Sequence, residues 1–195
     1  MPINLESWNC STVTGGKGSG KSELERMLLS KFPSVFVFDT LEEFPEYEGR
    51  RYVPRTDNPM ELESVARAVY NQGNCMLLVS ESELYLPVGK NLPPNIFKIM
   101  TRGRHRNVGL MADTRRIANL NKTVFSLSDH CFIFHTWSPN DLDYLRGFIP
   151  NDVRGLASLP DYYFWHYSRG VVEVHDPIKL LPVRNLPTTK KATDS

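Results

Sequence analysis

The chain has 195 residues, of which 41% are hydrophobic and 23% charged, and its formal net charge is +1. This composition is that of an ordinary globular protein, long enough for one full core. A nucleic-acid partner would have to be met by a local basic patch, because the global charge is near zero. Cys10, Cys75 and Cys131 are too few and too widely spaced for a disulfide framework or a zinc site, so we expect buried, reduced thiols in a cytosolic protein. No stretch approaches the roughly 20 apolar residues of a membrane span, and no secretory signal opens the chain.

A glycine-rich segment near the start carries the strongest motif. Gly15, Gly20, Lys21 and Ser22 fit the pattern G-x-x-x-x-G-K-[ST] of the phosphate-binding P-loop. Glycines let the backbone approach a phosphate closely, and successive N–H groups then bind it. We expect Lys21 to reach the β- and γ-phosphates of ATP and Ser22 to bind Mg²⁺. The nucleotide-binding residues expected in the loop are Gly15, Gly16, Lys17, Gly18, Ser19, Gly20, Lys21 and Ser22.

The segments around this loop fit the motif. A β-prone run over about residues 5–13 predicts the first strand, and amphipathic spacing over about residues 22–31 predicts a helix that ends before Pro33. Residues 34–39 are a continuous β-branched and aromatic run, which is typical of a buried strand in a parallel sheet. Asp39 ends this run, and an acid there lies at the ligand-binding edge of the sheet, so Asp39 is a candidate nucleotide-binding residue. A helix or turn cap is the alternative interpretation of Asp39.

Residues 75–81 form the second informative stretch, an apolar strand that ends in an acid. This is the Walker B pattern, which commonly ends in Asp-Glu. Here Ser80 holds the Asp position and Glu81 the position of the water-activating base, so Ser22, Ser80 and Glu81 are the candidate metal-binding residues. A serine brings no negative charge to Mg²⁺, so metal binding would depend more on Ser22 and the phosphates. Glu83 allows a second register, and a buried strand with a solvated acidic end is the alternative.

A basic segment follows in the middle of the chain. A predicted helix over residues 95–100 continues into residues 101–107, which hold Arg102, Arg104 and Arg106. Such a cluster is usually a solvated face. Just upstream of a core strand in a P-loop protein, it can also supply an arginine finger or phosphate contacts to nucleic acid.

The other predicted elements follow ordinary patterns. The five histidines show no metal-ligand spacing, so we interpret them as structural or surface residues. The aromatic residues of the C-terminal part are interpreted as core because of the area that such rings bury. The elements are helices over 60–71 and 138–146, strands over 108–112 and 129–135, and a hairpin over 162–167 and 171–174.

Residues 104–116, with the sequence RHRNVGLMADTRR, resemble the segment of HerA/FtsK-type ATPases that runs from an arginine through a Gly-containing strand to Thr-Gln-Arg-Pro. Residues 121–134 resemble that family's link and last core strand, and residues 37–43 its second strand. The resemblance covers about residues 8–136. It implies an α/β, RecA-like (ASCE) P-loop NTPase fold, with a mostly parallel central sheet flanked by helices. The C-terminal hairpin would be a small addition.

The resemblance also implies roles for single residues. Glu81 would orient the attacking water. Arg104 aligns best with the arginine that reaches a neighbouring subunit's nucleotide, with Arg106 and Arg102 as alternatives. The family's polar sensor, usually Gln after Thr, falls on Arg115, which follows Thr114; the resemblance thus makes Arg115 a candidate catalytic residue and Thr114 a candidate nucleotide-binding residue. Arg115 and the serine at position 80 are departures from the family's pattern.

The chain begins a few residues before the P-loop strand, without the N-terminal barrel of HerA proteins or the membrane regions of FtsK proteins. It is thereby similar to the genome-packaging ATPases of tailless, internal-membrane dsDNA phages and archaeal viruses. We expect one ATPase domain over residues 1–186 and a disordered tail over residues 187–195.

This resemblance implies an ATP- and Mg²⁺-dependent translocase in a ring of identical subunits, a hexamer or pentamer, that moves double-stranded DNA into a capsid. The loops over residues 84–94 and 115–122 would grip the DNA backbone. A capsid vertex or a membrane-associated packaging protein is a further expected partner, and the expected location is the host cytoplasm or the packaging vertex. The alternatives are a small-molecule or nucleoside kinase, with Asp39 as its base, and a filamentous-phage-type assembly ATPase or non-catalytic nucleotide-binding protein.

Overall fold

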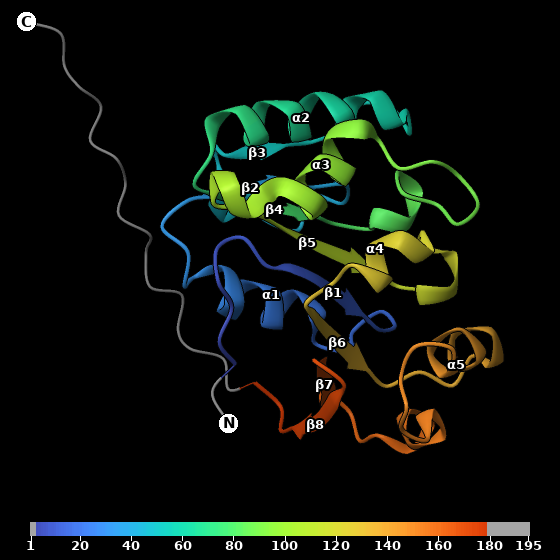
Figure 1. Cartoon of the computed structure of the whole chain (residues 1–195). Helices are drawn as coiled ribbons and strands as arrows, with labels where there is room; N and C mark the ends of the chain where they lie inside the picture. Colours follow the sequence, from blue (N-terminus) through green and yellow to red (C-terminus); the bar gives the residue numbers. More distant parts are fainter. Residues whose placement is uncertain (1–2, 179–195) are drawn as a thin grey trace, which may run out of the picture.

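The short runs of β-branched and aromatic residues form one eight-stranded sheet. In the computed structural model of the chain, which describes residues 3–178, the strand order is β3-β2-β4-β5-β1-β6-β7-β8 (Figure 1). The first six strands in this order are parallel, and β7 and β8 are antiparallel. The strands are β1 (Cys10–Thr14), β2 (Val35–Phe38), β3 (Arg51–Tyr52), β4 (Cys75–Val79), β5 (Val108–Thr114), β6 (His130–Phe134), β7 (Phe164–Ser168) and β8 (Val171–His175).

Helices cover both faces of the sheet, and the polar signals in the sequence set their ends. Asn58 caps the second helix, over residues 59–72, by accepting a hydrogen bond from the Met60 N–H at 2.9 Å, and Gly73, at φ +76°, ends this helix. The first helix packs alone on one face of the sheet, and the apolar sides of the other four pack on the opposite face. The helices are α1 (Lys21–Leu29), α2 (Pro59–Gln72), α3 (Pro94–Arg102), α4 (Lys122–Ser126) and α5 (Pro139–Arg146).

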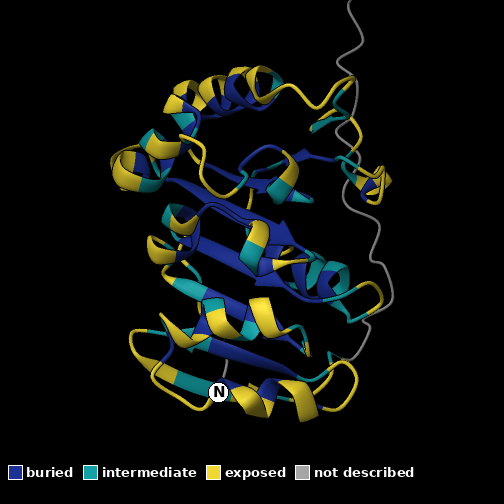
Figure 2. Cartoon of the chain, turned by 90° about the vertical axis from the view of Figure 1, so that its right-hand side faces the viewer, coloured by how far each residue is buried: buried dark blue, intermediate teal, exposed yellow. Residues whose placement is uncertain are grey.

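Short 3₁₀ turns fill the connections, at Pro45–Tyr47, Ser82–Leu84, Gly103–Arg106, Ile117–Asn119 and Val153–Ser158. Figure 2 shows the central strands dark blue and the outer sides of the helices yellow, so the core lies between the sheet and the helices. All three cysteines are buried free thiols, as predicted. None of the helices within residues 3–178 is long and apolar enough to span a bilayer.

The structure confirms the predicted C-terminal hairpin and also shows where the hairpin lies in the sheet, which the sequence did not predict. Its first strand pairs antiparallel with β6, with Phe132 opposite His166, so the hairpin extends the main sheet. The predicted tail over residues 187–195 lies outside the described residues.

Two strand boundaries differ from the prediction. The first strand begins at Cys10 instead of near residue 5, because Glu6 and Asn9 form a turn closed by the Asn9 N–H and the Glu6 carbonyl at 3.0 Å. The fifth strand continues past the predicted residue 112 to Thr114. Asp113 is therefore part of a buried strand and not of a loop.

Candidate nucleotide-binding site

The P-loop connects the end of β1 to the start of α1, at the edge of the sheet where the parallel strands end. At Gly20 the backbone has φ +102°, which a side chain would strain. At Gly15 an added Cβ would lie 2.6 Å from Phe134 Cβ, so this position accepts only glycine without rearrangement. Glycine is thus needed at both ends of the turn, for conformation at one end and for space at the other.

Lys21 is buried, with only 8% of its surface exposed, and its ammonium group folds back onto the loop. Nζ donates a hydrogen bond to the Gly15 carbonyl at 2.9 Å and lies 3.5 Å from the Gly16 carbonyl. Its nearest carboxylate is Asp113, whose Oδ1 is 3.8 Å away. The lysine charge is therefore held at the floor of the loop, where phosphates bind in P-loops.

Two buried acids lie beneath the loop. Asp113 is next to Val13 in the register of β5 and β1, and Glu25 is on the side of α1 that faces the sheet. Among the described residues, Asp113 Oδ1 and both carboxylate oxygens of Glu25 lack a hydrogen-bond partner. Burial raises the pKa of Asp113 to about 7, against the opposing charge of Lys21. Burial, and next the charge of Asp113, raise the pKa of Glu25 well above its ordinary value.

The Ser80 hydroxyl links the end of β4 to the end of β2. Its Oγ accepts a hydrogen bond from the Thr40 N–H at 2.8 Å, and the Thr40 hydroxyl donates to the Ser80 carbonyl at 2.6 Å. The Ser22 hydroxyl, from the first turn of α1, donates instead to Glu43 Oε2 at 3.1 Å. The two hydroxyls predicted to serve Mg²⁺ thus have different partners.

Glu81 lies at the carboxyl end of β4, in a left-handed backbone conformation with φ +45°. Its carboxylate pairs with the guanidinium of Arg115, Nη2 to Oε1, at 2.5 Å. The backbone N–H of Arg115 donates to Glu83 Oε1 at 3.0 Å, which fixes the loop that carries this arginine. Burial raises the pKa of Glu81, and the charge of Arg115 opposes that rise.

A half-open cavity of about 240 Å³ brings most of the predicted residues together. The P-loop forms one wall, and the ends of β4 and β5 form the other. Tyr162, which precedes β7, lies at the rim with 55% of its surface exposed, and its ring is 3.4 Å from an added Cβ at Gly20. The lining residues are Lys17, Gly18, Ser19, Gly20, Lys21, Ser22, Glu23, Leu41, Glu43, Ser80, Glu81, Asp113, Arg115 and Tyr162.

No protein-family model and no curated protein sequence matches the chain. Among solved structures it resembles the genome-packaging NTPase B204 of Sulfolobus turreted icosahedral virus 2 bound to ATPγS, at 21% identity over 90% of this chain and 100% of that one, with a TM-score of 0.76. The DNA-packaging ATPase B204 of Sulfolobus turreted icosahedral virus gives 21% identity, the same coverage and a TM-score of 0.78. The pCW3 conjugation coupling protein TcpA, with ATPγS, gives 12% identity over 89% of this chain and 61% of that one, with a TM-score of 0.63.

The chain has a RecA-like P-loop NTPase fold. Its strand order has β5 between the P-loop strand β1 and the strand β4 that ends at the candidate base, as the ASCE arrangement requires. The predicted fold class is confirmed, and so is the predicted resemblance to viral packaging ATPases at the level of the fold.

Two predicted nucleotide-binding residues of this NTPase fold have other partners. Asp39 is fully buried, and its two oxygens accept hydrogen bonds from the backbone N–H groups of Glu43 and Phe44, both at 3.0 Å. These bonds correspond to the turn-cap alternative. Thr114 is also buried, and its Oγ1 lies 3.2 Å from both the backbone N and the carbonyl oxygen of Arg116. Neither side chain is among those that line the cavity.

The arginines of the basic segment lie at the amino ends of the parallel strands, opposite the carboxyl ends where the P-loop lies. They precede Val108, where β5 begins, whereas the P-loop follows the ends of the strands. The length of β5, seven residues, separates the two edges by roughly 20 Å at about 3.3 Å per residue. Arg104 is exposed, with Cζ 5.8 Å from the centre of the Trp8 ring. Arg106 donates to the Tyr70 and Asn71 carbonyls near the end of α2, a structural role.

The cavity also has lining residues that the sequence did not predict as site residues, namely Glu23, Leu41, Glu43, Asp113 and Tyr162. Asp113 could have been found, because it ends an apolar run in the same way as Asp39. The sequence carried no signal for Tyr162, which comes from a segment more than a hundred residues away and reaches the P-loop only through the pairing of β7 with β6.

Proposed function

We propose that this chain is an ATP-driven translocase of double-stranded DNA, and that it acts as a genome-packaging ATPase in a ring of identical subunits. One observation carries the hydrolytic part of the proposal: the candidate base Glu81 lines the same cavity as Lys21 and Ser22. A carboxylate opposite a phosphate-binding loop can orient water for attack on the γ-phosphate. The packaging part is supported by the solved structures that share this fold, which include DNA-packaging ATPases.

The residues of the cavity fit the Mg²⁺ ion that ATP carries. Mg²⁺ takes oxygen ligands, and Asp113 offers a buried carboxylate oxygen that has no hydrogen-bond partner within residues 3–178. Asp113 and Ser22 would hold the ion, which would neutralise charge on the β- and γ-phosphates. Asp113 would in this way supply the negative charge that Ser80 lacks, from the neighbouring strand of the sheet.

The two loops proposed to contact DNA lie side by side. Pro87 and Leu120 form an antiparallel bridge, and the Val88 N–H donates to the Asn119 carbonyl at 2.8 Å. Lys90 and Lys122 are exposed on this pair of loops. Two lysines on adjoining loops can contact phosphates without reading sequence. Arg116 does not contribute in the same way, because its guanidinium pairs with Asp141 at 2.8 Å.

A ring is supported by the position of Arg104. Arg104 lies at the amino ends of the strands and cannot reach the nucleotide of its own subunit, so it would contact the nucleotide bound to a neighbouring subunit. An arginine supplied in trans stabilises the charge of the transition state.

The deciding experiment measures ATP hydrolysis by the purified full chain with and without double-stranded DNA. We expect turnover that DNA stimulates and that Lys21→Ala and Glu81→Gln both abolish. In a Lys90→Ala/Lys122→Ala variant, basal turnover stays and the stimulation weakens, whereas Arg67→Ala on the exposed side of α2 changes neither. Turnover that does not change when DNA of any length is added would contradict a translocase. Phosphoryl transfer to an added nucleoside would favour the alternative function, a nucleoside kinase.

A further inference from the structure

Four side chains able to bind metal gather on one face of the last three strands of the sheet. Residues directly opposite in the register are His166 and Glu173, and Phe164 and His175. In the neighbouring strand β6, Phe132 is opposite His166, and His130 lies two residues before Phe132. Because side chains alternate between the two faces of a sheet, the three histidines and Glu173 all point to the same side.

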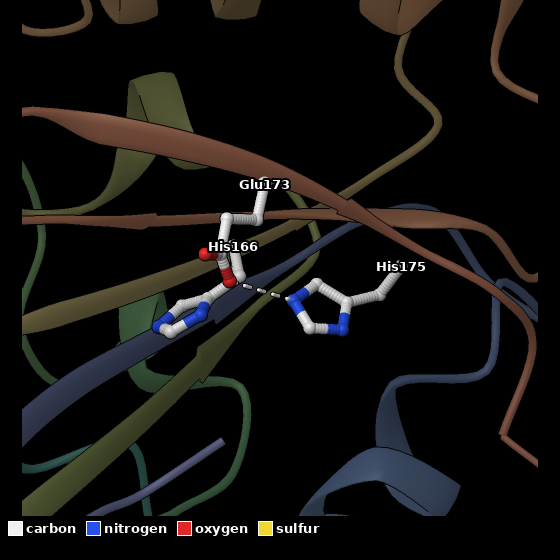
Figure 3. Close-up of side chains that lie close together, drawn as sticks. All are labelled: His166, Glu173 and His175. Atoms are coloured by element: carbon white, nitrogen blue, oxygen red, sulfur yellow. Dashed lines mark ion pairs between the residues drawn. The ribbon is translucent and has the colours of Figure 1, made fainter. Parts of the chain in front are cut away.

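The potential ligand atoms already lie close together. One ligand atom each from His166, Glu173 and His175 lies within 4.8 Å of the others, and Figure 3 shows the Glu173 carboxylate between the two imidazole rings. His175 Nε2 is 3.5 Å from Glu173 Oε2, and it is buried without a hydrogen-bond partner among the described residues. An unpartnered buried nitrogen beside a carboxylate is costly unless a proton or a cation satisfies both.

Aromatic stacking holds the two rings in place. The His166 ring lies over Phe132 at 4.7 Å between centroids, and the His175 ring over Phe164 at 5.1 Å, both nearly parallel. His166 Nε2 is 2.9 Å from His130 Nδ1, which leaves Nδ1 of His166 as its other nitrogen.

We propose that His166, Glu173 and His175 bind a divalent transition-metal ion, with zinc as the best match to the ligands, and that His130 orients His166. Two imidazoles and one carboxylate with a fourth position for water are a known zinc ligand set. Bonds of about 2.0–2.2 Å in a tetrahedral site put ligand atoms roughly 3.3–3.6 Å apart. The 3.5 Å between His175 and Glu173 meets this already, and His166, whose ligand atom lies within 4.8 Å of the other two, would move closer as the ion binds. The ion would fasten the edge strand β8 to β7.

The test is zinc titration of the full chain after chelator treatment, by calorimetry in excess Mg²⁺ so that the P-loop site does not compete. We expect one zinc ion per chain and a higher melting temperature with zinc. Co²⁺ in place of zinc should give the visible absorption bands of tetrahedral coordination. Glu173→Gln and His175→Gln, both near the open edge, should weaken zinc binding more than a hundredfold, and His130→Phe about 10–100-fold.

The control variant is His105→Ala, since this exposed histidine lies in the turn before the central strand β5 and outside the cluster. Its zinc affinity should equal that of the unmodified chain. Zinc binding that is absent, that does not saturate, or that survives both Glu173→Gln and His175→Gln would overturn the proposal. The folding of each variant is checked by its melting temperature without metal, so that a lost fold is not mistaken for a lost site.

Discussion

The guanidinium of Arg115 and the carboxylate of Glu81 form an ion pair 2.5 Å long across the rim of the P-loop cavity. The glutamate side chain is 12% exposed and the arginine 40%. The pair joins the ends of two adjacent strands, one with the candidate base and the other with the residue in the sensor position. We expect the γ-phosphate of bound ATP to compete with Glu81 for Arg115, and so to free the carboxylate to orient water.

Substitution of Arg115 should change the pH dependence of hydrolysis. Burial raises the pKa of Glu81 and Arg115 lowers it, so Arg115→Gln should raise this pKa further. The base works only when ionised, and the acidic limb of the rate profile should therefore move to higher pH. Profiles of kcat against pH for the unmodified chain and Arg115→Gln test this. The Glu81→Gln variant should be slower by about 10²–10⁴ on the pH plateau, where Glu81 of the unmodified chain is ionised, and the difference should shrink along the acidic limb. An acidic limb that does not move in Arg115→Gln would separate the ion pair from catalysis.

Asp113 should contribute to Mg²⁺ binding, whereas Ser80 should not. In Asp113→Asn we expect the gain in ATP affinity from Mg²⁺ to fall about tenfold, or about 1.4 kcal/mol, because a charged ligand is replaced by a neutral one. Ser80→Ala should change it less than twofold, since the Ser80 hydroxyl bonds to Thr40. Nucleotide titrations with Mg²⁺ and with EDTA provide the readout. A larger loss of Mg²⁺-dependent affinity in Ser80→Ala than in Asp113→Asn would instead assign the metal-binding role to Ser80, at the Walker B position.

Tyr162 should contribute to binding of the nucleotide base. It is an exposed ring at the rim of the cavity, beside the P-loop. Loss of an aromatic platform for a base costs about 1–3 kcal/mol, so Tyr162→Ala should weaken ATP binding roughly 5- to 150-fold. Tyr162→Phe keeps the ring and should bind ATP within twofold of the unmodified chain. Equal binding by all three forms would place the base elsewhere.

Arg104 should act between subunits. Arg104→Ala should bind ATP normally and hydrolyse it about 10³–10⁵ times more slowly. Lys21→Ala should be inactive for a different reason, loss of its own site. Mixed rings contain interfaces where an intact site meets an intact arginine, so mixing the two inactive proteins should restore part of the activity. Arg102→Ala is the matched control from the same exposed segment, and it should keep full turnover. A mixture as inactive as its components would contradict action in trans.

Glu25 should lower the stability of the fold at neutral pH. Its buried carboxyl has a raised pKa in the folded chain, so the folded state retains a proton that the unfolded chain releases. Stability then falls as pH rises above the ordinary Glu value. Glu25→Met should stabilise the chain by about 1–3 kcal/mol near pH 8, because an unsatisfied buried group is removed, and by less near pH 5. Urea unfolding at both values measures this, with Glu23→Met on the same helix expected within about 0.5 kcal/mol of the unmodified chain. A gain that is the same at both pH values would contradict the assigned cause.

The P-loop and the order of the elements could be predicted because their signals are local. The P-loop motif, the apolar run before Glu81 and the turn at Arg169 and Gly170 within the hairpin each span only a few neighbouring positions. Boundaries were less well predicted. Asp113 appeared to follow a strand, and only the pairing of Val13 with Asp113 shows that it continues one.

The sequence by itself therefore determined the fold class and the position of the P-loop. Only the tertiary structure decided which side chains share a site. Asp113 lies beside Lys21, and Pro87 beside Leu120, because strand order and register join segments far apart in the chain. The histidines looked unrelated in sequence, and an antiparallel pairing placed His166 between His130 and Glu173. Such contacts depend on register, and a register is fixed by burial of a whole sheet face and not by any local pattern.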